Sequence, residues 1–127
     1  MIVGIGVDLI KIQRIKEALD RSGMRFLEKV FTPKEIELAS KGEDRAAYFA
    51  TRFAAKESVL KAFCTGWAGV KGTDIHIEPG ARGEPLVKLS GGLAEMASQR
   101  GVTRVLVSLS YDSEYAIAMC ILLGSRP

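Results

Sequence analysis

The chain has 127 residues, of which 47% are hydrophobic and 26% are charged, with a formal net charge of +3. This length supports one hydrophobic core and excludes two ordinary domains, so residues 1–127 are expected to form a single domain. The mild basic excess favours an anionic partner, but the basic residues form no run of the kind that binds nucleic acid.

The cysteines and the start of the chain predict the compartment. Cys64 and Cys120 lie in apolar contexts without CxxC spacing or a disulfide framework, so both are expected to be reduced core residues. Met1 leads directly into a strand pattern, and no apolar run is long enough to span a bilayer. The expectation is a soluble, cytoplasmic and unprocessed protein.

The first element is expected to be a buried strand from Ile2 to Leu9. Gly4 and Gly6 interrupt its apolar run and would allow a ligand or another backbone to come close. Asp8 is expected to end the strand, where a carboxylate can either cap the next helix or bind a metal. The cap is the commoner use.

A basic amphipathic helix is expected from Ile10 to Arg21. Its apolar stripe is Ile12, Ile15 and Leu19. The basic row beside that stripe consists of Lys11, Arg14 and Arg21, and Arg25 continues it. Such a row is either a solvated face or a docking surface for an acidic partner helix.

The next segment carries clear helix signals. Thr32-Pro-Lys-Glu35 has the spacing of a capping box and predicts a helix from Pro33 to about Ser40. Asp44 is placed to cap a second, longer helix.

The segment from Phe49 to Gly66 is expected to be the second half of this long helix, ended by Gly66 and packed on most sides. Glu57 and Lys61 would share a face with two alanines, and Arg52 and Lys56 would form a cationic row nearby. A carboxylate between cations suits a divalent metal that holds phosphate oxygens. An ordinary Glu57–Lys61 pair at helical spacing explains the same residues equally well.

The second half of the chain is expected to be mainly strands. The pattern predicts strands over Thr73–Glu78 and Leu86–Leu89 joined by a turn, a helix over Gly91–Gln99, and a second hairpin of Val105–Leu109 and Tyr115–Leu123. Helices followed by strands give an α+β fold, with a long central helix packed on a mainly antiparallel sheet.

Three segments together resemble the bacterial holo-[acyl carrier protein] synthases, the small class of 4'-phosphopantetheinyl transferases. They are Gly4-Ile-Gly-Val-Asp8, Arg52-Phe-Ala-Ala-Lys-Glu-Ser-Val-Leu-Lys61 and Gly83-Glu-Pro85. The resemblance implies a phosphopantetheinyl-transferase-like fold that assembles as a homotrimer. It also implies that Mg²⁺ supports transfer of the phosphopantetheine arm of coenzyme A to a serine of apo acyl carrier protein, which releases adenosine 3',5'-bisphosphate.

The same resemblance implies a role for individual residues. Asp8 and Glu57 would be the metal ligands, and Lys61 would hold the pyrophosphate. Arg52, Gly66 and Pro85 would line the coenzyme A site. The basic row of Lys11, Arg14, Arg21 and Arg25 would receive the acidic helix of the carrier protein.

One position departs from the family pattern. Tyr111 stands where many relatives have a histidine, and a tyrosine with an ordinary pKa of about 10 is a poor base at neutral pH. The proton of the carrier serine is therefore expected to pass to Glu57 or to a metal-bound water that Glu57 orients.

Two other functions are compatible with parts of the sequence. A non-catalytic module could use the basic helix Lys11–Arg21 to bind an acidic protein or RNA, with Asp8 and Glu57 as cap and ion pair. A different Mg²⁺-dependent nucleotide enzyme is a third possibility, although the sequence lacks the Gly-x-x-x-x-Gly-Lys-Ser/Thr loop of P-loop ATPases.

Overall fold

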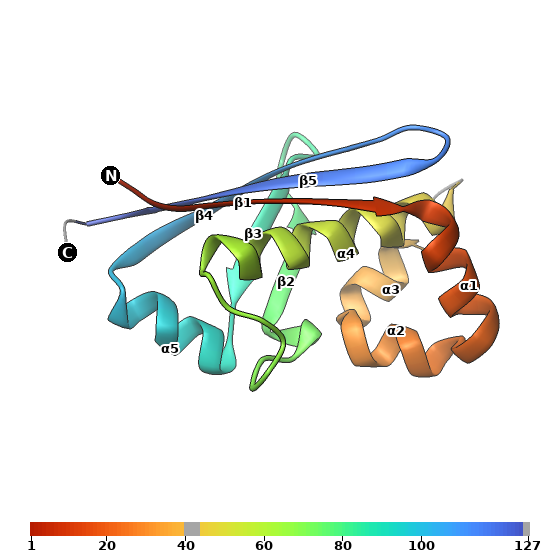
Figure 1. The fold of residues 1–127 in the computed structure, drawn as a ribbon, viewed down its shortest axis with the longest axis horizontal. Coiled ribbons are helices and arrows are strands. Elements are labelled where there is room, and N and C mark those ends of the chain that lie inside the picture. The colour runs from red at the N-terminus through yellow and green to blue at the C-terminus, as the bar shows by residue number, and fades with distance from the viewer. Residues whose placement is uncertain (40–43, 126–127) are drawn as a thin grey trace.

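A three-stranded antiparallel sheet in the order β1-β5-β4 lies against one long helix, α4 (Figure 1). The structure is a computed structural model and describes residues 1–39 and 44–125. The elements follow one another as β1 (Ile2–Lys11), α1 (Ile12–Ser22), α2 (Met24–Val30), α3 (Pro33–Ala39), α4 (Arg45–Ala62), the 3-10 turn η1 (Gly72–Asp74), β2 (Ile75–Pro79), β3 (Pro85–Leu89), α5 (Gly91–Gln99), β4 (Val102–Tyr111) and β5 (Tyr115–Gly124). The strands β2 and β3 pair as a separate antiparallel hairpin. The expected α+β fold is confirmed.

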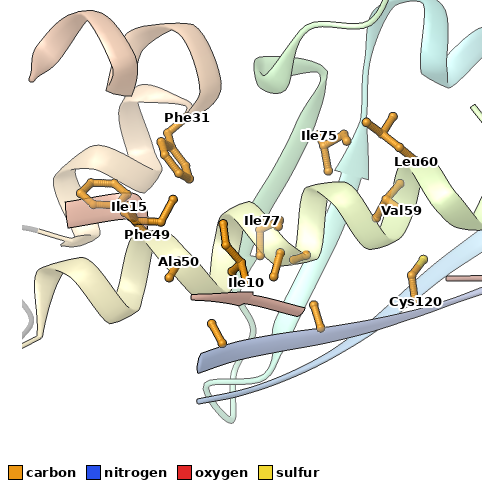
Figure 2. Close-up of a cluster of buried hydrophobic side chains, with 14 of the residues drawn as sticks. Ile10, Ile15, Phe31, Phe49, Ala50, Val59, Leu60, Ile75, Ile77 and Cys120 are labelled. Carbon is orange, nitrogen blue, oxygen red and sulfur yellow. The ribbon is translucent and has the colours of Figure 1, made fainter. Parts of the chain in front are cut away.

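The core lies between the sheet and α4. Alternate residues of β5 are buried against the helix, and Cys120 and Leu122 are among them. Figure 2 shows Phe49, Ala50, Val59 and Leu60 of α4 within this cluster. The expectation that α4 is packed on most sides is confirmed.

Two glycines explain why β1 can lie so close to α4. A Cβ atom on Gly6 would lie 2.1 Å from the carbonyl oxygen of Ser58, and one on Gly4 would lie 2.2 Å from that of Ala62. Real Cβ atoms do not approach backbone atoms so closely, so these positions require glycine. The expected approach of another backbone is thus confirmed, and that backbone belongs to α4.

The first strand is longer than expected. Its pairing with β5 continues to Lys11, which lies opposite Tyr115. Asp8 therefore lies inside the strand, opposite Ala118, and α1 begins only at Ile12. The prediction that Asp8 ends the strand is wrong, and so is its use as a helix cap, because hydrogen bonds to β5 keep this segment extended.

The long helix ends earlier than expected. Cys64 adopts a left-handed φ of 55°, and Thr65 N donates to Leu60 O at 2.9 Å while Cys64 N donates to Lys61 O at 3.0 Å. These bonds satisfy carbonyl groups of the last turn, as in a Schellman motif. Cys64, and not Gly66, therefore ends α4, and its side chain is exposed instead of lying in the core as predicted.

Both predicted helix caps are confirmed. Thr32 N donates to Glu35 Oε1 at 2.9 Å, and Glu35 N donates to Thr32 Oγ1 at 3.2 Å. Ala47 N donates to Asp44 Oδ1 at 3.0 Å at the start of α4. The expected helix end at Ser40 lies outside the described residues.

Candidate active site

An ion pair joins β1 to α4 where the two elements lie side by side. Asp8 is on the same face of β1 as Gly6 and Ile10, the face that packs toward α4. Lys61 Nζ donates to Asp8 Oδ1 at 2.9 Å and to Val7 O at 3.2 Å. The side chain of Lys61 is 53% exposed and that of Asp8 is 14% exposed, so the pair borders solvent.

A second carboxylate lies one helical turn away. Glu57 precedes Lys61 by four residues and therefore faces the same side of α4. Its Oε1 accepts a hydrogen bond from Trp67 Nε1 at 2.8 Å. Among the described residues Lys61 pairs with Asp8 and not with Glu57, so the ordinary Glu57–Lys61 pair is not observed.

The donor chemistry of these two acids fits Mg²⁺. In the described part of the chain, Asp8 Oδ2 and Glu57 Oε2 have no protein donor, so each carboxylate keeps an oxygen available. Mg²⁺ binds oxygen atoms and commonly uses one or two carboxylates, with waters and substrate phosphates in the other positions. Asp8 and Glu57 could therefore hold such an ion beside the ammonium group of Lys61.

The predicted cationic row of Arg52 and Lys56 is wrong. Lys56 is fully buried, and its Nζ contacts Glu35 Oε1 at 2.6 Å, Val30 O at 2.8 Å and Gly72 O at 2.9 Å. Burial lowers the pKa of Lys56, and the neighbouring carboxylate of Glu35 opposes that effect. Lys56 ties together segments of the fold and has no free donor for a phosphate.

Arg52 lies apart from the two acids. It precedes Lys61 by nine residues, about two and a half helical turns, and so lies on the opposite side of α4. Its guanidinium lies 4.1 Å from the ring centroid of Tyr48, and its Nη1 donates to Thr51 Oγ1 at 3.1 Å. Burial raises the pKa of Tyr48, and Arg52 opposes that effect.

The other two predicted coenzyme A residues come from different parts of the fold. Gly66 is in the loop after α4, next to Trp67, whereas Pro85 begins β3 and pairs with Pro79. Within the described residues, no hydrogen bond or ion pair joins Gly66 or Pro85 to Asp8, Glu57 or Lys61. The structure joins Asp8 to Lys61, places Glu57 one helical turn from Lys61 on the same side of α4, and leaves the predicted coenzyme A residues dispersed.

The predicted docking residues form one exposed basic surface, defined here as Lys11, Arg14, Arg21 and Arg25. A hollow in this region is lined by Arg14 and Arg21, by the acidic Glu17, and by apolar side chains that include Phe26 and Phe53. A largely apolar hollow with two arginines at its wall suits an amphipathic acidic helix.

Tyr111 is on a different part of the surface. It is the last residue of β4, is 55% exposed, and lines a hollow with Leu9 and Ile117 at the end of the sheet.

Trp67 is a residue of this site that sequence reasoning missed. The sequence assigned it no role, yet its indole N–H donates to Glu57 ten positions earlier in the chain. The available signal was the single tryptophan of the chain directly after the helix that carries the charged residues.

Comparisons with known proteins agree on one family. A family model described as the 4'-phosphopantetheinyl transferase superfamily matches residues 4–120. The holo-[acyl-carrier-protein] synthase of Desulforudis audaxviator is 46% identical over 126 residues, which cover 98% of this chain and 95% of that protein. That of Clostridium acetobutylicum is 43% identical, covering 96% of this chain and 98% of the relative.

Solved structures are similar over nearly the whole chain. The holo-[acyl-carrier-protein] synthase of Neisseria meningitidis superposes with a TM-score of 0.89 at 31% identity, covering 97% of this chain and 99% of that one. The structure of the Helicobacter pylori enzyme in complex with coenzyme A has a TM-score of 0.83 at 32% identity. The match covers 94% of this chain and 99% of that one. Within the described residues, no helix has the length and apolar character needed to cross a membrane.

Proposed function

Because this chain belongs to the 4'-phosphopantetheinyl transferase superfamily, we propose a specific role in catalysis or binding for each of its predicted site residues. The protein is a holo-[acyl carrier protein] synthase, which transfers the 4'-phosphopantetheine arm of coenzyme A to apo acyl carrier protein. We propose that residues 1–127 act as one domain in the cytoplasm, consistent with the free thiols of Cys64 and Cys120. The observation that carries the residue assignment is the ion pair of Lys61 with Asp8 across the contact between β1 and α4, with Glu57 one helical turn from Lys61 on the same side of α4.

Asp8 and Glu57 are the proposed ligands of Mg²⁺. When bound, this ion would neutralise negative charge on the pyrophosphate of coenzyme A. The two carboxylates come from different elements that are packed backbone to backbone, so their separation is fixed by the fold. The support is the donor set itself, two acids with one available oxygen each.

Lys61 is proposed to hold the pyrophosphate. Its ammonium group borders solvent and is directed by Asp8, so it can meet phosphate oxygens without leaving the site. Phosphoryl transfer is accelerated mainly by positioning and by neutralising charge on the transferred group and the leaving oxygens. As the oxygen of the carrier serine attacks phosphorus, its proton passes to Glu57 or to water, and adenosine 3',5'-bisphosphate leaves.

The positions of the coenzyme A residues favour a site that a second copy completes. Arg52 lies on the side of α4 opposite Lys61, so the two side chains of one copy point away from each other. The outward face of the sheet is strongly apolar: Ile5 is 65% exposed, Val7 53% and Leu9 60%. We propose that this face packs in a homotrimer, in which Arg52, Gly66 and Pro85 line a coenzyme A site at the boundary between copies.

The basic surface is the proposed docking site for the carrier protein. Four exposed basic side chains, two of which (Arg14 and Arg21) line a largely apolar hollow, can bind an acidic amphipathic helix, with charge guiding the encounter. The non-catalytic alternative would use the same surface but would not require Asp8, Glu57 and Lys61 to meet.

One experiment tests the assignment. The protein is incubated with coenzyme A, Mg²⁺ and an apo acyl carrier protein, and the carrier is weighed by mass spectrometry. Wild type and the control Glu95→Gln, at an exposed position of α5, are expected to add the arm, whereas Glu57→Gln and Asp8→Asn are expected to lose transfer while remaining folded. No mass gain with wild type would refute the transferase function, and full activity of Glu57→Gln would refute the metal assignment.

A further inference from the structure

Trp67 holds the carboxylate of Glu57 from outside the helix. Its Nε1 lies 2.8 Å from Glu57 Oε1 in a partly buried environment. An indole N–H can only donate, and a hydrogen bond to a carboxylate is stronger than one between neutral groups. The contact therefore fixes one oxygen of Glu57 and leaves Oε2 for a ligand.

The chain around Trp67 is folded so that the ring has a defined place. The left-handed turn at Cys64 reverses the chain after α4. Val70 N then donates to Trp67 O at 3.0 Å, which closes a turn from Trp67 to Val70. The indole forms one wall of an apolar hollow with Val30, Phe53 and Val70. The hydrogen bond from the indole restricts the rotamer of Glu57.

The two acids of the site are consequently held in different ways. Asp8 is held by Lys61, a long side chain that is 53% exposed. Glu57 is held by a ring that is packed on one side and hydrogen-bonded on the other. A free Glu side chain loses rotamer entropy when it is ordered, and the hydrogen bond from Trp67 imposes that order before any ligand arrives.

We infer that Trp67 is a positioning residue, whose indole N–H orients Glu57 for metal binding and for transfer. The inference rests on the proposed role of Glu57. Groups that orient a metal ligand through a hydrogen bond typically change metal affinity by about 10–100-fold when they are removed. Trp67 acts only through Glu57 and needs no contact with substrate.

The test separates the N–H group from the ring. Because the chain has a single tryptophan, supplying β-(3-benzothienyl)alanine in its place during expression replaces Trp67 alone. Sulfur then stands where the N–H was, and the ring keeps its size. Trp67→Phe is the genetic counterpart. Phe53→Leu is the matched control, because it alters the same hollow without touching the hydrogen bond to Glu57.

The readout is Mn²⁺ affinity, measured by electron paramagnetic resonance without carrier protein, together with kcat, KM and Tm. Both Trp67 replacements are expected to weaken Mn²⁺ binding about 10-fold and to lower kcat by a similar factor, with KM for the carrier unchanged. Phe53→Leu is expected to lower Tm and leave Mn²⁺ affinity unchanged.

The inference is overturned if the benzothienyl protein binds Mn²⁺ as tightly as wild type, or if Phe53→Leu weakens binding as much as Trp67→Phe. The first result would make the hydrogen bond irrelevant, and the second would make the effect one of packing. Failure of the proposed function would give a different result. Wild-type protein would then not modify any carrier protein, and this outcome does not depend on the Mn²⁺ affinities of the variants.

Discussion

Lys61 and Asp8 are 53 residues apart in the sequence, yet the ammonium nitrogen of one lies 2.9 Å from a carboxylate oxygen of the other. The pair connects the helix that carries Glu57 to the first strand. It borders solvent, and ion pairs of this kind contribute about 0–1 kcal/mol to stability. Its value to the protein is therefore expected to lie in placing charge and not in holding the fold.

Replacing Lys61 should accordingly separate activity from stability. For Lys61→Met we expect Tm to change by no more than a few degrees, because an exposed pair is lost. The kcat for arm transfer should fall by about 10²–10³-fold, because a charge that stabilises the transition state is lost. Thermal melts and carrier mass spectrometry measure the two effects. A variant that transfers at the wild-type rate would show that Lys61 does not hold the pyrophosphate.

Gly6→Ala is expected to destabilise the protein although it adds a single methyl group. The new Cβ would lie 2.1 Å from Ser58 O and 2.6 Å from Ala62 N, so β1 would have to move away from α4. Overpacking of this kind typically costs about 1–3 kcal/mol. Gly66→Ala is the matched control, because a Cβ added there would have no described atom within 4 Å. Urea unfolding of both variants measures the difference, and equal stability would contradict the close contact.

Lys56→Met tests the buried ion pair. Removing the ammonium group leaves Glu35 buried without its cationic partner, which is expected to cost about 3–5 kcal/mol in unfolding free energy. The double variant Lys56→Met, Glu35→Gln should lose less than the sum of the two single variants, because no unpaired charge remains. Lys34→Met, at an exposed position of α3, is the control and should be nearly neutral. Additive losses in the double variant would contradict direct coupling.

Arg14→Glu tests docking. Charge reversal within the basic surface should raise KM for the carrier protein about 10-fold or more and leave the affinity for coenzyme A unchanged. Lys88→Glu makes the same charge change on β3, outside that surface, and should leave KM for the carrier near the wild-type value. Equal losses of carrier and coenzyme A affinity in Arg14→Glu would show that the surface is misassigned.

Cys120 predicts a loss of stability at alkaline pH. Burial raises the pKa of its thiol to about 12 from an ordinary value of 9.0. Between these values the unfolded thiol loses its proton while the folded thiol keeps it, so rising pH favours unfolding by about 1.4 kcal/mol per pH unit from this group. The stability advantage of wild type over Cys120→Ala should therefore shrink by about 2 kcal/mol from pH 9 to 10.5.

Denaturant unfolding at several pH values measures this gap. Leu122→Val, on the same strand, removes no titratable group, so its difference from wild type should stay constant with pH. A constant gap for Cys120→Ala as well would show that the thiol titrates alike in both states.

The sequence predicted features that depend on nearby residues. The capping box of Thr32 and Glu35 and the cap at Asp44 involve groups three positions apart, and both form as expected. The resemblance named the family and also Asp8 and Lys61, which form an ion pair between β1 and α4. These successes follow from local geometry and from motif order, which a linear sequence records.

Most of the errors involve partners that are distant along the chain. Lys56 was predicted to be an accessible cation because its hydrogen-bond partners, Glu35 and the carbonyl of Gly72, are far from it in the sequence. Asp8 looked like a strand end because its pairing partner is Ala118. Trp67 could not be assigned to Glu57 without the left-handed turn at Cys64, and a left-handed cysteine is rare enough that Gly66 was the natural prediction.

The glycine contact between β1 and α4 has a consequence for ion size. Calcium–oxygen bonds are roughly 0.3–0.5 Å longer than magnesium–oxygen bonds, so a site discriminates between these ions when its walls cannot spread. Here the walls that carry Asp8 and Glu57 are two main chains in direct contact at Gly6. Selectivity for Mg²⁺ over Ca²⁺ would then be a property of backbone packing. Substituting side chains at the site would not be enough to make the protein prefer Ca²⁺.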